Sequence, residues 1–201
     1  MTPSGMHYAH ARDIIKKYKV SCIIEKPPCM KPSQAKELFK LAKKYNLKVF
    51  PIFQNRYNKA IKFVKNELRK GNLGKIITAN LNLRWCRPQR YYDLSIWRGT
   101  FSHDGGAFTN QGIHYIDLLR YLAGEVSDVF CTMRTYGAKI EVEDTGVAIV
   151  KFKNGSIGNV EITTAARPAD FGAYITLVAS KGIIKIGGLA ANKIEYYSIN
   201  N

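Results

Sequence analysis

The chain has 201 residues, of which 46% are apolar and 11% aromatic, so it can bury a sizeable core and is neither disordered nor of low complexity. Its 31 Lys and Arg against 15 Asp and Glu give a formal net charge of +16. No apolar run reaches the roughly 20 residues of a membrane helix and the first residues lack a signal-peptide stretch, which argues against a membrane partner and favours a cytoplasmic protein.

The first part of the chain alternates helices with short apolar strands. Apolar spacing predicts a helix over residues 5–19, with Met6, Ala9 and Ile14 on its apolar side. A nearly continuous apolar run at 20–24 predicts a strand that is covered on both faces. A second helix over 32–46 and a strand over 48–53 complete a pattern that is typical of a doubly wound parallel sheet. We therefore expect one α/β unit over residues 1–53.

The positive charge is concentrated in this part of the chain. Residues 1–75 contain 18 Lys and Arg but only 4 Asp and Glu. Such a segment could attract nucleic acid, an anionic membrane surface or a phosphorylated small ligand. The lysines fall on the polar sides of the predicted helices, however, so we favour a solvated surface, and nucleic acid is the least favoured partner.

The second part of the chain is richer in alternating, strand-like segments. We expect a helix over 57–70, a strand over 75–85, a long polar and aromatic loop over 86–103 and a helix over 110–122. The Asn154-Gly155 pair predicts a hairpin. We therefore expect an α+β domain over residues 54–201, built on a mostly antiparallel sheet. The further strands are expected over 126–136, 145–152, 156–163, 173–179 and 182–186.

The sequence Glu25-Lys26-Pro27 lies at the carboxyl end of the first predicted strand. Ligands of open α/β sheets bind beyond the carboxyl ends of the strands. A lysine there can stabilise negative charge that develops on a substrate hydroxyl. The alternative is a surface lysine in a turn, and the three residues alone do not decide between the two.

A second group of polar residues follows the glycine pair Gly105-Gly106. In one continuous helix, Asn110, His114 and Asp117 would share a seam. Histidine exchanges protons near neutral pH, and a neighbouring carboxylate can fix its tautomer. The glycines would permit close approach of a ligand. The alternative is a core histidine that is satisfied by Asp117.

The loop before that helix combines arginines with aromatic residues. Arginine binds phosphate or carboxylate through paired hydrogen bonds, and aromatic rings stack on planar groups, so the loop suits an anionic nucleotide or a sugar acid. Single-stranded nucleic acid and a purely structural loop are the alternatives. The candidate ligand-binding residues are Arg87, Tyr91, Trp97 and Arg98. The four cysteines match neither a zinc pattern nor a disulfide framework, so we expect no metal site.

Several of these segments, taken in order, resemble the glucose-fructose oxidoreductase/inositol dehydrogenase (Gfo/Idh/MocA) family. Residues 2–7 resemble the segment after the fourth strand of its nucleotide domain. Glu25-Lys26-Pro27 resembles its active-site strand end, and residues 104–117 resemble its catalytic helix. The segments 142–145 and 152–158 resemble its sheet hairpin.

The resemblance implies an NAD- or NADP-dependent oxidoreductase that oxidises a sugar hydroxyl to a ketone. Lys26 would polarise the hydroxyl, His114 would be the general acid/base, and Glu25, Lys26 and Pro27 would face the cofactor. Many members have Asp where this chain has Asn110, which can bind substrate but cannot take a proton. The residues at 97–100 and 110–114 are most similar to those of family members that oxidise C3 of UDP-N-acetylglucosaminuronic acid in surface-polysaccharide synthesis. The residues expected to bind this sugar or sugar-nucleotide substrate are Arg87, Tyr91, Trp97, Arg98, Asn110 and Asp117.

The chain departs from the family at its nucleotide domain. A G-x-G-x-x-G turn and an acidic residue on the second strand normally seat the dinucleotide, and neither occurs in these 201 residues. We therefore expect an incomplete fold, truncated at both ends, with residues 1–53 as a Rossmann remnant. The fragment would be inactive alone and would form a homo-oligomer through its antiparallel sheet. A non-catalytic binding or assembly fragment is the alternative.

Overall fold

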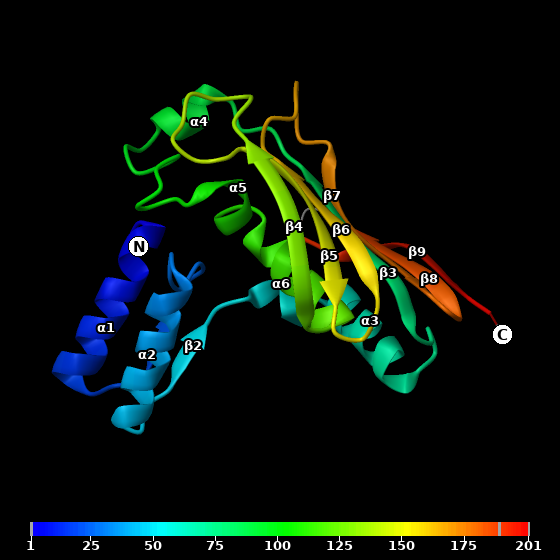
Figure 1. Cartoon of the computed structure of the whole chain (residues 1–201), viewed down its shortest axis with the longest axis horizontal. Helices are drawn as coiled ribbons and strands as arrows, with labels where there is room; N and C mark the ends of the chain where they lie inside the picture. The colour runs from blue at the N-terminus through cyan, green and yellow to red at the C-terminus, as the bar shows by residue number, and fades with distance from the viewer. Residues whose placement is uncertain (1, 189, 201) are drawn as a thin grey trace.

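A computed structural model describes residues 2–188 and 190–200, and Figure 1 shows two units joined by one crossing segment. In the smaller unit, strands β1 (Cys22–Ile24) and β2 (Val49–Pro51) pair in parallel. Figure 1 shows two helices beside this pair, α1 (His7–Tyr18), which follows the short 3-10 turn η1 (Ser4–Met6), and α2 (Pro32–Lys44). The predicted alternation of helix and parallel strand is confirmed.

Two details of the smaller unit differ from the predictions. Helix α1 buries Tyr8, Ala11 and Ile15, whereas Ile14 is partly exposed and lies along a cavity. The predicted apolar side was wrong because this helix has apolar residues around much of its circumference. Strand β1 is also not covered on both faces, since Ile23 is 72% exposed while its neighbour Ile24 is buried against the helices.

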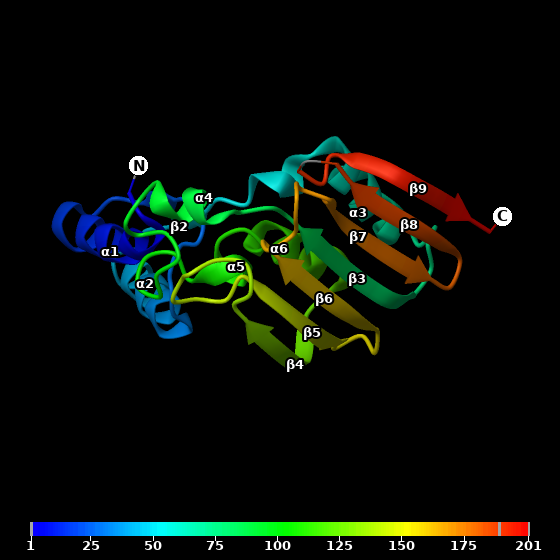
Figure 2. The ribbon, with the colours of Figure 1, turned by 90° about the horizontal axis from the view of Figure 1, so that it is seen from above.

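The larger unit is a seven-stranded sheet with helices on one face. Viewed from above, the strands form a twisted layer in the order β4-β5-β6-β3-β7-β8-β9 (Figure 2). The chain enters this unit through the 3-10 turn η2 (Gln54–Tyr57). Its helices are α3 (Lys59–Lys70), α4 (Gln89–Asp93), α5 (Gly106–Thr109) and α6 (Ile113–Ala123). Its strands are β3 (Ile76–Arg84), β4 (Val126–Arg134), β5 (Thr145–Phe152), β6 (Ile157–Thr163), β7 (Gly172–Ala179), β8 (Gly182–Gly187) and β9 (Lys193–Ile199).

The sheet is antiparallel except at its centre, where β3 pairs in parallel with β6 and antiparallel with β7. The predicted hairpin at Asn154-Gly155 is confirmed, because it joins β5 to β6 and Gly155 has a φ of +88°. Strand β9 was not predicted, and it pairs with β8 as an exposed edge strand. Edge strands bury few side chains and so have a weak apolar signal.

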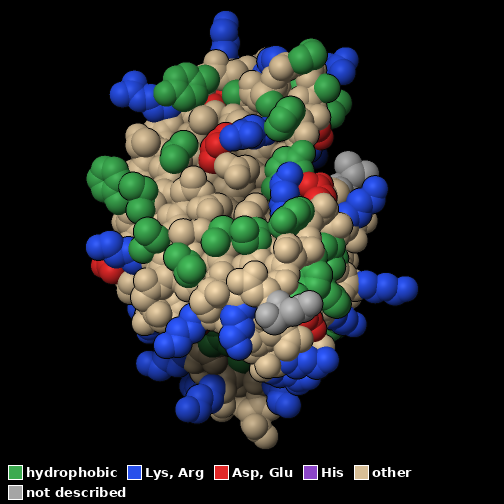
Figure 3. All heavy atoms as spheres, turned by 90° about the vertical axis from the view of Figure 1, so that its right-hand side faces the viewer, with side chains coloured by type: hydrophobic (Ala, Val, Ile, Leu, Met, Phe, Trp, Pro, Cys, Tyr) green, Lys and Arg blue, Asp and Glu red, His purple; other side chains and the backbone are tan. Residues whose placement is uncertain are grey.

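Alternating side chains give the sheet one buried and one open face. Leu81 and Leu83 of β3 lie in the core with α6, and the intervening Asn80 and Asn82 lie on the open side. There, Arg84 makes paired hydrogen bonds with Glu161 of β6. Figure 3, seen from the right-hand side of Figure 1, shows apolar side chains scattered among polar ones. The exposed apolar residues of the central strands include Val147, Ile149, Ile157 and Ile183.

Candidate functional site

A cavity of about 490 Å³ lies between the two units. One wall comes from the start of the chain, the first turns of α1 and the carboxyl end of β1, and the other from the loop after α4 and the end of α5. This is the position at which open parallel sheets bind their ligands. Of the predicted site residues, the cavity lining includes Glu25, Lys26, Tyr91, Trp97, Arg98 and Asn110.

Lys26 joins the two walls of this cavity. Its ammonium Nζ donates to the backbone oxygen of Asn110 at 2.9 Å and to the side-chain Oδ1 of Asn110 at 3.2 Å. Burial lowers the pKa of Lys26 and the nearby Arg98 lowers it further, whereas Glu25 and Asp104 act in the opposite direction. An ammonium has three N–H donors. Since two of them hold Asn110, one donor is left for a ligand oxygen.

Asn110 and His114 are not on one helix as predicted. Helix α5 ends at Thr109 with Asn110 as its C-cap, and α6 begins only at Ile113. At the break, Gly112 packs against the Ile162 side chain of β6, which would have to shift to make room for a larger residue. The predicted seam of three polar residues was therefore wrong, although Asn110 still reaches Lys26.

Asp104 is a site residue that the sequence analysis did not single out by itself. Its side chain is 1% exposed, accepts the backbone N–H of Gly99 at 2.8 Å and accepts a short hydrogen bond from the Asn110 amide. Asp104 thereby fixes the orientation of the Asn110 amide, with Nδ2 toward Asp104 and Oδ1 toward Lys26. The only sequence signal is a carboxylate six residues before Asn110, which is not a recognisable motif.

We expect Asp104→Ala to lower the free energy of unfolding by about 2 to 4 kcal/mol, because it leaves buried donors on Gly99 and Asn110 without an acceptor. Urea unfolding followed by circular dichroism measures the change. The matched control is Asp93→Ala, which removes an exposed carboxylate that accepts only from Gln89 in the described chain. An equal effect of both substitutions would contradict the role assigned to Asp104.

His114 lies in the first turn of α6, where it is partly buried and is not among the residues that line the cavity. Burial lowers its pKa, the charge of Lys26 lowers it further, and Glu25 and Asp117 partly oppose the shift. The ring of Phe53 packs edge-on against the imidazole, with the ring centroids 6.3 Å apart. The buried Nδ1 has no hydrogen-bond partner within the described chain. Burial and the charge of Lys26 thus favour the neutral form of the imidazole, which can act as a base.

Asp117 does not bond to His114, contrary to the alternative of a satisfied core histidine. Its carboxylate receives two hydrogen bonds from the Arg56 guanidinium, with Nε to Oδ2 at 2.7 Å and a second, shorter bond from Nη2. Asp117 is also absent from the cavity lining. A role of Asp117 in substrate binding remains a prediction. The contact between Asp117 and Arg56 could not be predicted from the spacing of residues.

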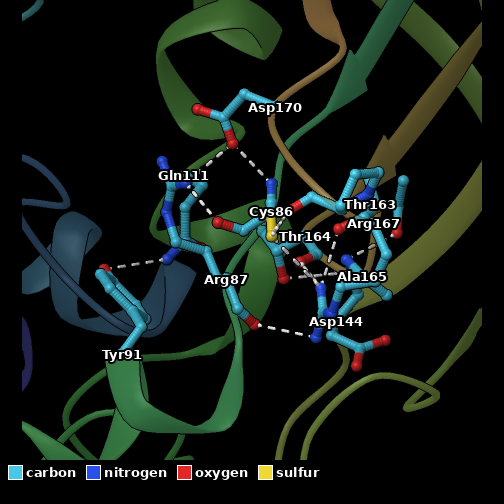
Figure 4. Close-up of polar contacts among 12 residues, drawn as sticks. Cys86, Arg87, Tyr91, Gln111, Asp144, Thr163, Thr164, Ala165, Arg167 and Asp170 are labelled. Atoms are coloured by element: carbon cyan, nitrogen blue, oxygen red, sulfur yellow. Dashed lines mark hydrogen bonds and ion pairs between the residues drawn. The ribbon is translucent and has the colours of Figure 1, made fainter.

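The arginines of the loop have different partners. Arg98 lines the cavity, donates a short hydrogen bond to the Tyr91 hydroxyl, and keeps its buried Nε without a partner in the described chain. Arg87 lies outside the cavity lining and is paired with Asp170 at 3.1 Å (Figure 4). The same figure shows Gln111 donating to Tyr91. Arg98 is therefore the arginine with capacity for an anionic ligand in this cavity.

The glycine pair Gly105-Gly106 does not leave room for a ligand, as was predicted, but has a structural role. Gly105 and Gly106 have φ angles of +81° and +89°. A side chain on Gly106 would collide with the carboxylate of Glu143, whose backbone and side-chain oxygens accept the N–H groups of Ala107 and Phe108. The space beside Gly106 is thus filled by Glu143. Burial raises the pKa of that carboxyl.

The lining of the cavity fits one end of a dinucleotide. The turn formed by Ser4 and His7 faces it, and the His7 Nδ1 hydrogen bonds to the backbone oxygen of Pro27 at 2.9 Å, which places this segment against the strand end. Glu25, Lys26 and Pro27 are at that strand end, where the cofactor contact was predicted. No phosphate-binding glycine turn occurs in the sequence, so the residues present fit the nicotinamide end alone.

Residues 2–188 and 190–200 lack two further features. They contain no cluster of His, Cys, Asp and Glu side chains that could hold a metal ion. They also contain no helix with the length and apolar character needed to cross a membrane.

Comparison with protein families gives matches over most of the chain. Residues 61–185 match the GFO/IDH/MocA C-terminal domain, and residues 1–53 match the oxidoreductase family with an NAD-binding Rossmann fold. The solved structure of the WlbA dehydrogenase from Bordetella pertussis, a complex with NADH and UDP-GlcNAcA, is 35% identical with a TM-score of 0.95. That comparison covers 100% of this chain and 62% of the WlbA chain.

Two curated relatives are more distant. The uncharacterized oxidoreductase YhhX of Escherichia coli is 26% identical over 92% of this chain and 51% of its own length. The myo-inositol 2-dehydrogenase of Thermotoga maritima is 27% identical over 84% of this chain and 49% of its own length. The chain thus spans about half the length of these curated relatives.

Proposed function

Because the chain belongs to the GFO/IDH/MocA family of oxidoreductases, we propose that it carries the substrate-facing, proton-transferring part of an NAD(P)-dependent sugar-nucleotide dehydrogenase. The proposed reaction is oxidation of the C3 hydroxyl of a UDP-N-acetylhexosaminuronic acid to a ketone. The observation that carries the proposal is the Lys26 ammonium, anchored on Asn110 at the strand end and facing the cavity, and near enough to His114 for its charge to lower the pKa of the imidazole. The WlbA complex, which contains NADH and UDP-GlcNAcA, supports this choice of ligands.

The chemistry requires removal of a hydride from carbon and a proton from oxygen. A bound nicotinamide cofactor supplies the hydride acceptor. His114 takes the hydroxyl proton, because its lowered pKa leaves the imidazole neutral at pH 7. Lys26 directs its remaining N–H at the same oxygen and stabilises the negative charge that develops as the proton leaves. Asn110 holds the ammonium in place and does not take part in proton transfer.

Substrate recognition is proposed to depend on Arg98. Its buried Nε lacks a partner in the described chain, and its guanidinium lies against the rings of Tyr91 and Trp97, at 4.3 and 5.0 Å from their centroids. These rings fix the plane of the guanidinium, which then presents a donor to a carboxylate. A sugar acid satisfies this donor, whereas a neutral sugar leaves it buried and unpaired. Arg87, paired with Asp170, remains a weaker candidate for substrate binding.

The test is NADH formation measured at 340 nm with UDP-GlcNAcA and with UDP-N-acetylglucosamine, whose sugar carries no carboxylate. The chain is assayed alone and after addition of the part of the WlbA dehydrogenase that the comparison leaves uncovered. We expect turnover of the acid with the supplemented chain and a kcat/KM at least about tenfold lower for the neutral sugar. Arg98→Met should remove this preference, and Arg90→Met, on the exposed side of α4, should keep it.

Binding of UDP-GlcNAcA without any turnover in the supplemented chain would contradict the proposal and favour the non-catalytic binding fragment.

We also propose that the enzyme acts in cytoplasmic surface-polysaccharide synthesis, where sugars of this type are used. A second copy covering the open face of the seven-stranded sheet is the proposed oligomer, supported by the exposed Val147 and Ile149. The division of the chain at residues 53 and 54 also stays a prediction.

A further inference from the structure

Arg56 occupies the crossing point between the two units. It lies in η2, the turn through which the chain passes from β2 into the larger unit. Its guanidinium binds the Asp117 carboxylate through two N–H groups. The central guanidinium carbon, Cζ, lies 5.6 Å from the ring centroid of Phe53 and 4.9 Å from that of Tyr121. One side chain thus connects the turn, the segment before it and helix α6.

Two of the residues that Arg56 contacts, Phe53 and Asp117, are neighbours of His114. Phe53 has the Arg56 guanidinium near its ring and packs edge-on against the imidazole. Asp117 lies three residues after His114, which is nearly one turn of α6. A carboxylate at this spacing on a helix can approach the histidine ring, unless another partner holds it elsewhere.

We propose that Arg56 is a positioning residue for His114. Arg56 connects α6 to the segment that carries Phe53, and it binds the Asp117 carboxylate. This carboxylate therefore neither hydrogen bonds to the imidazole nor drives its protonation. The bidentate pair is largely shielded, because the Asp117 side chain is only 10% exposed. A planar guanidinium satisfies both carboxylate oxygens at once, which a lysine cannot do. The buried Nδ1 of His114 consequently remains without a partner in the described chain.

The charges around the imidazole give this arrangement a measurable consequence. Glu25 and Lys26 act on it from the end of β1, Asp117 from α6 and, through Asp117, Arg56 from η2. Removing Arg56 leaves the negative charge of Asp117 uncompensated, which favours the protonated imidazole. Removing the charge of Asp117 leaves Arg56 uncompensated, which disfavours it. The two substitutions must therefore change the pKa of His114 in opposite directions.

The test is an NMR titration of the four imidazoles of the 201-residue chain between pH 5 and 8.5, with the His114 signal assigned by its loss in His114→Gln. We expect Arg56→Met to raise the pKa of His114 by about half a pH unit or more, and Asp117→Asn to lower it by a similar amount. In the double variant, the pKa of His114 should be close to its wild-type value. Arg120→Met, which removes an exposed arginine of α6 paired with Glu125, is the matched control and should leave the value unchanged.

Shifts of the same sign in both single variants, or no shift in either, would overturn the inference. If Arg56→Met does not fold, Asp117→Asn still decides by the sign of its shift, and Arg56→Lys should loosen Phe53 and change the chemical shift of His114 while keeping the charge. The inference rests on the proposed role of His114 in proton transfer. Because the titration observes the imidazole itself, its failure would leave the dehydrogenase assay unaffected, and a failed assay would leave the titration interpretable.

Discussion

Substitution of His114 by glutamine is expected to lower kcat by about 10²- to 10⁴-fold, the range typical of a lost general base. Glutamine keeps the polarity and approximate size of the side chain but cannot accept the hydroxyl proton. The measurement is NADH formation by the supplemented chain with UDP-GlcNAcA. The matched control is His103→Gln, because the His103 imidazole hydrogen bonds to the hydroxyl of the neighbouring Ser102.

The pH profile adds a second measurement of the same residue. A general base works only when it is deprotonated, so kcat/KM rises with pH through the pKa of His114. Burial and the charge of Lys26 lower that pKa below its ordinary value of 6.5. The rising limb should therefore lie on the acid side of 6.5, with a plateau around neutrality. A profile that kept this limb in His114→Gln would contradict the assignment.

Substitution of Lys26 by methionine is expected to lower kcat by about 10²- to 10³-fold, because the developing alkoxide loses its charged hydrogen-bond donor. Methionine retains most of the apolar stem of the lysine, so the packing at the end of β1 is little changed. Lys26→Met also removes the two hydrogen bonds to Asn110. The affinity for UDP-GlcNAcA, measured by calorimetry, should therefore fall less than kcat.

The control for this substitution is Lys31→Met, which removes an exposed ammonium at the start of α2. It should retain wild-type kcat, since a charge at the surface is screened by solvent. The lowered pKa of Lys26 also predicts that kcat declines at alkaline pH, beginning below the ordinary lysine value of 10.5, as the ammonium loses its proton. Loss of substrate affinity with unchanged kcat in Lys26→Met would assign Lys26 to binding alone.

The features that the sequence predicted depend on local signals. Prolines after an apolar run placed Lys26 at the end of a strand, and the structure puts it there, on the cavity. The Asn154-Gly155 turn and the alternation of residues in β5 fixed that hairpin, because a two-residue period is independent of distant partners. The family resemblance then supplied an interpretation for residues that are weak signals alone.

The features that the sequence did not predict depend on distant partners. Nothing near Asp117 indicates that Arg56, 61 residues earlier, takes its carboxylate. At the break between Asn110 and His114, Gly112 packs on β6, and Glu143 fills the space beside Gly106 from a separate loop. In each case a tertiary contact determines the position of a residue whose local sequence is compatible with several structures.

The placement of β3 at the centre of the sheet also constrains how the larger unit forms. Residues 76–84 are made early, but both partners of this strand, β6 and β7, begin only at Ile157 and Gly172. Closing chain segments of that length is entropically costly, so contacts between such distant residues form slowly. The strands of the smaller unit end at residue 51, whereas β3 must wait for almost all of the remaining chain. Leu81 and Leu83 therefore lack their sheet partners until those strands have been made, which leaves this strand open to misassociation on a ribosome.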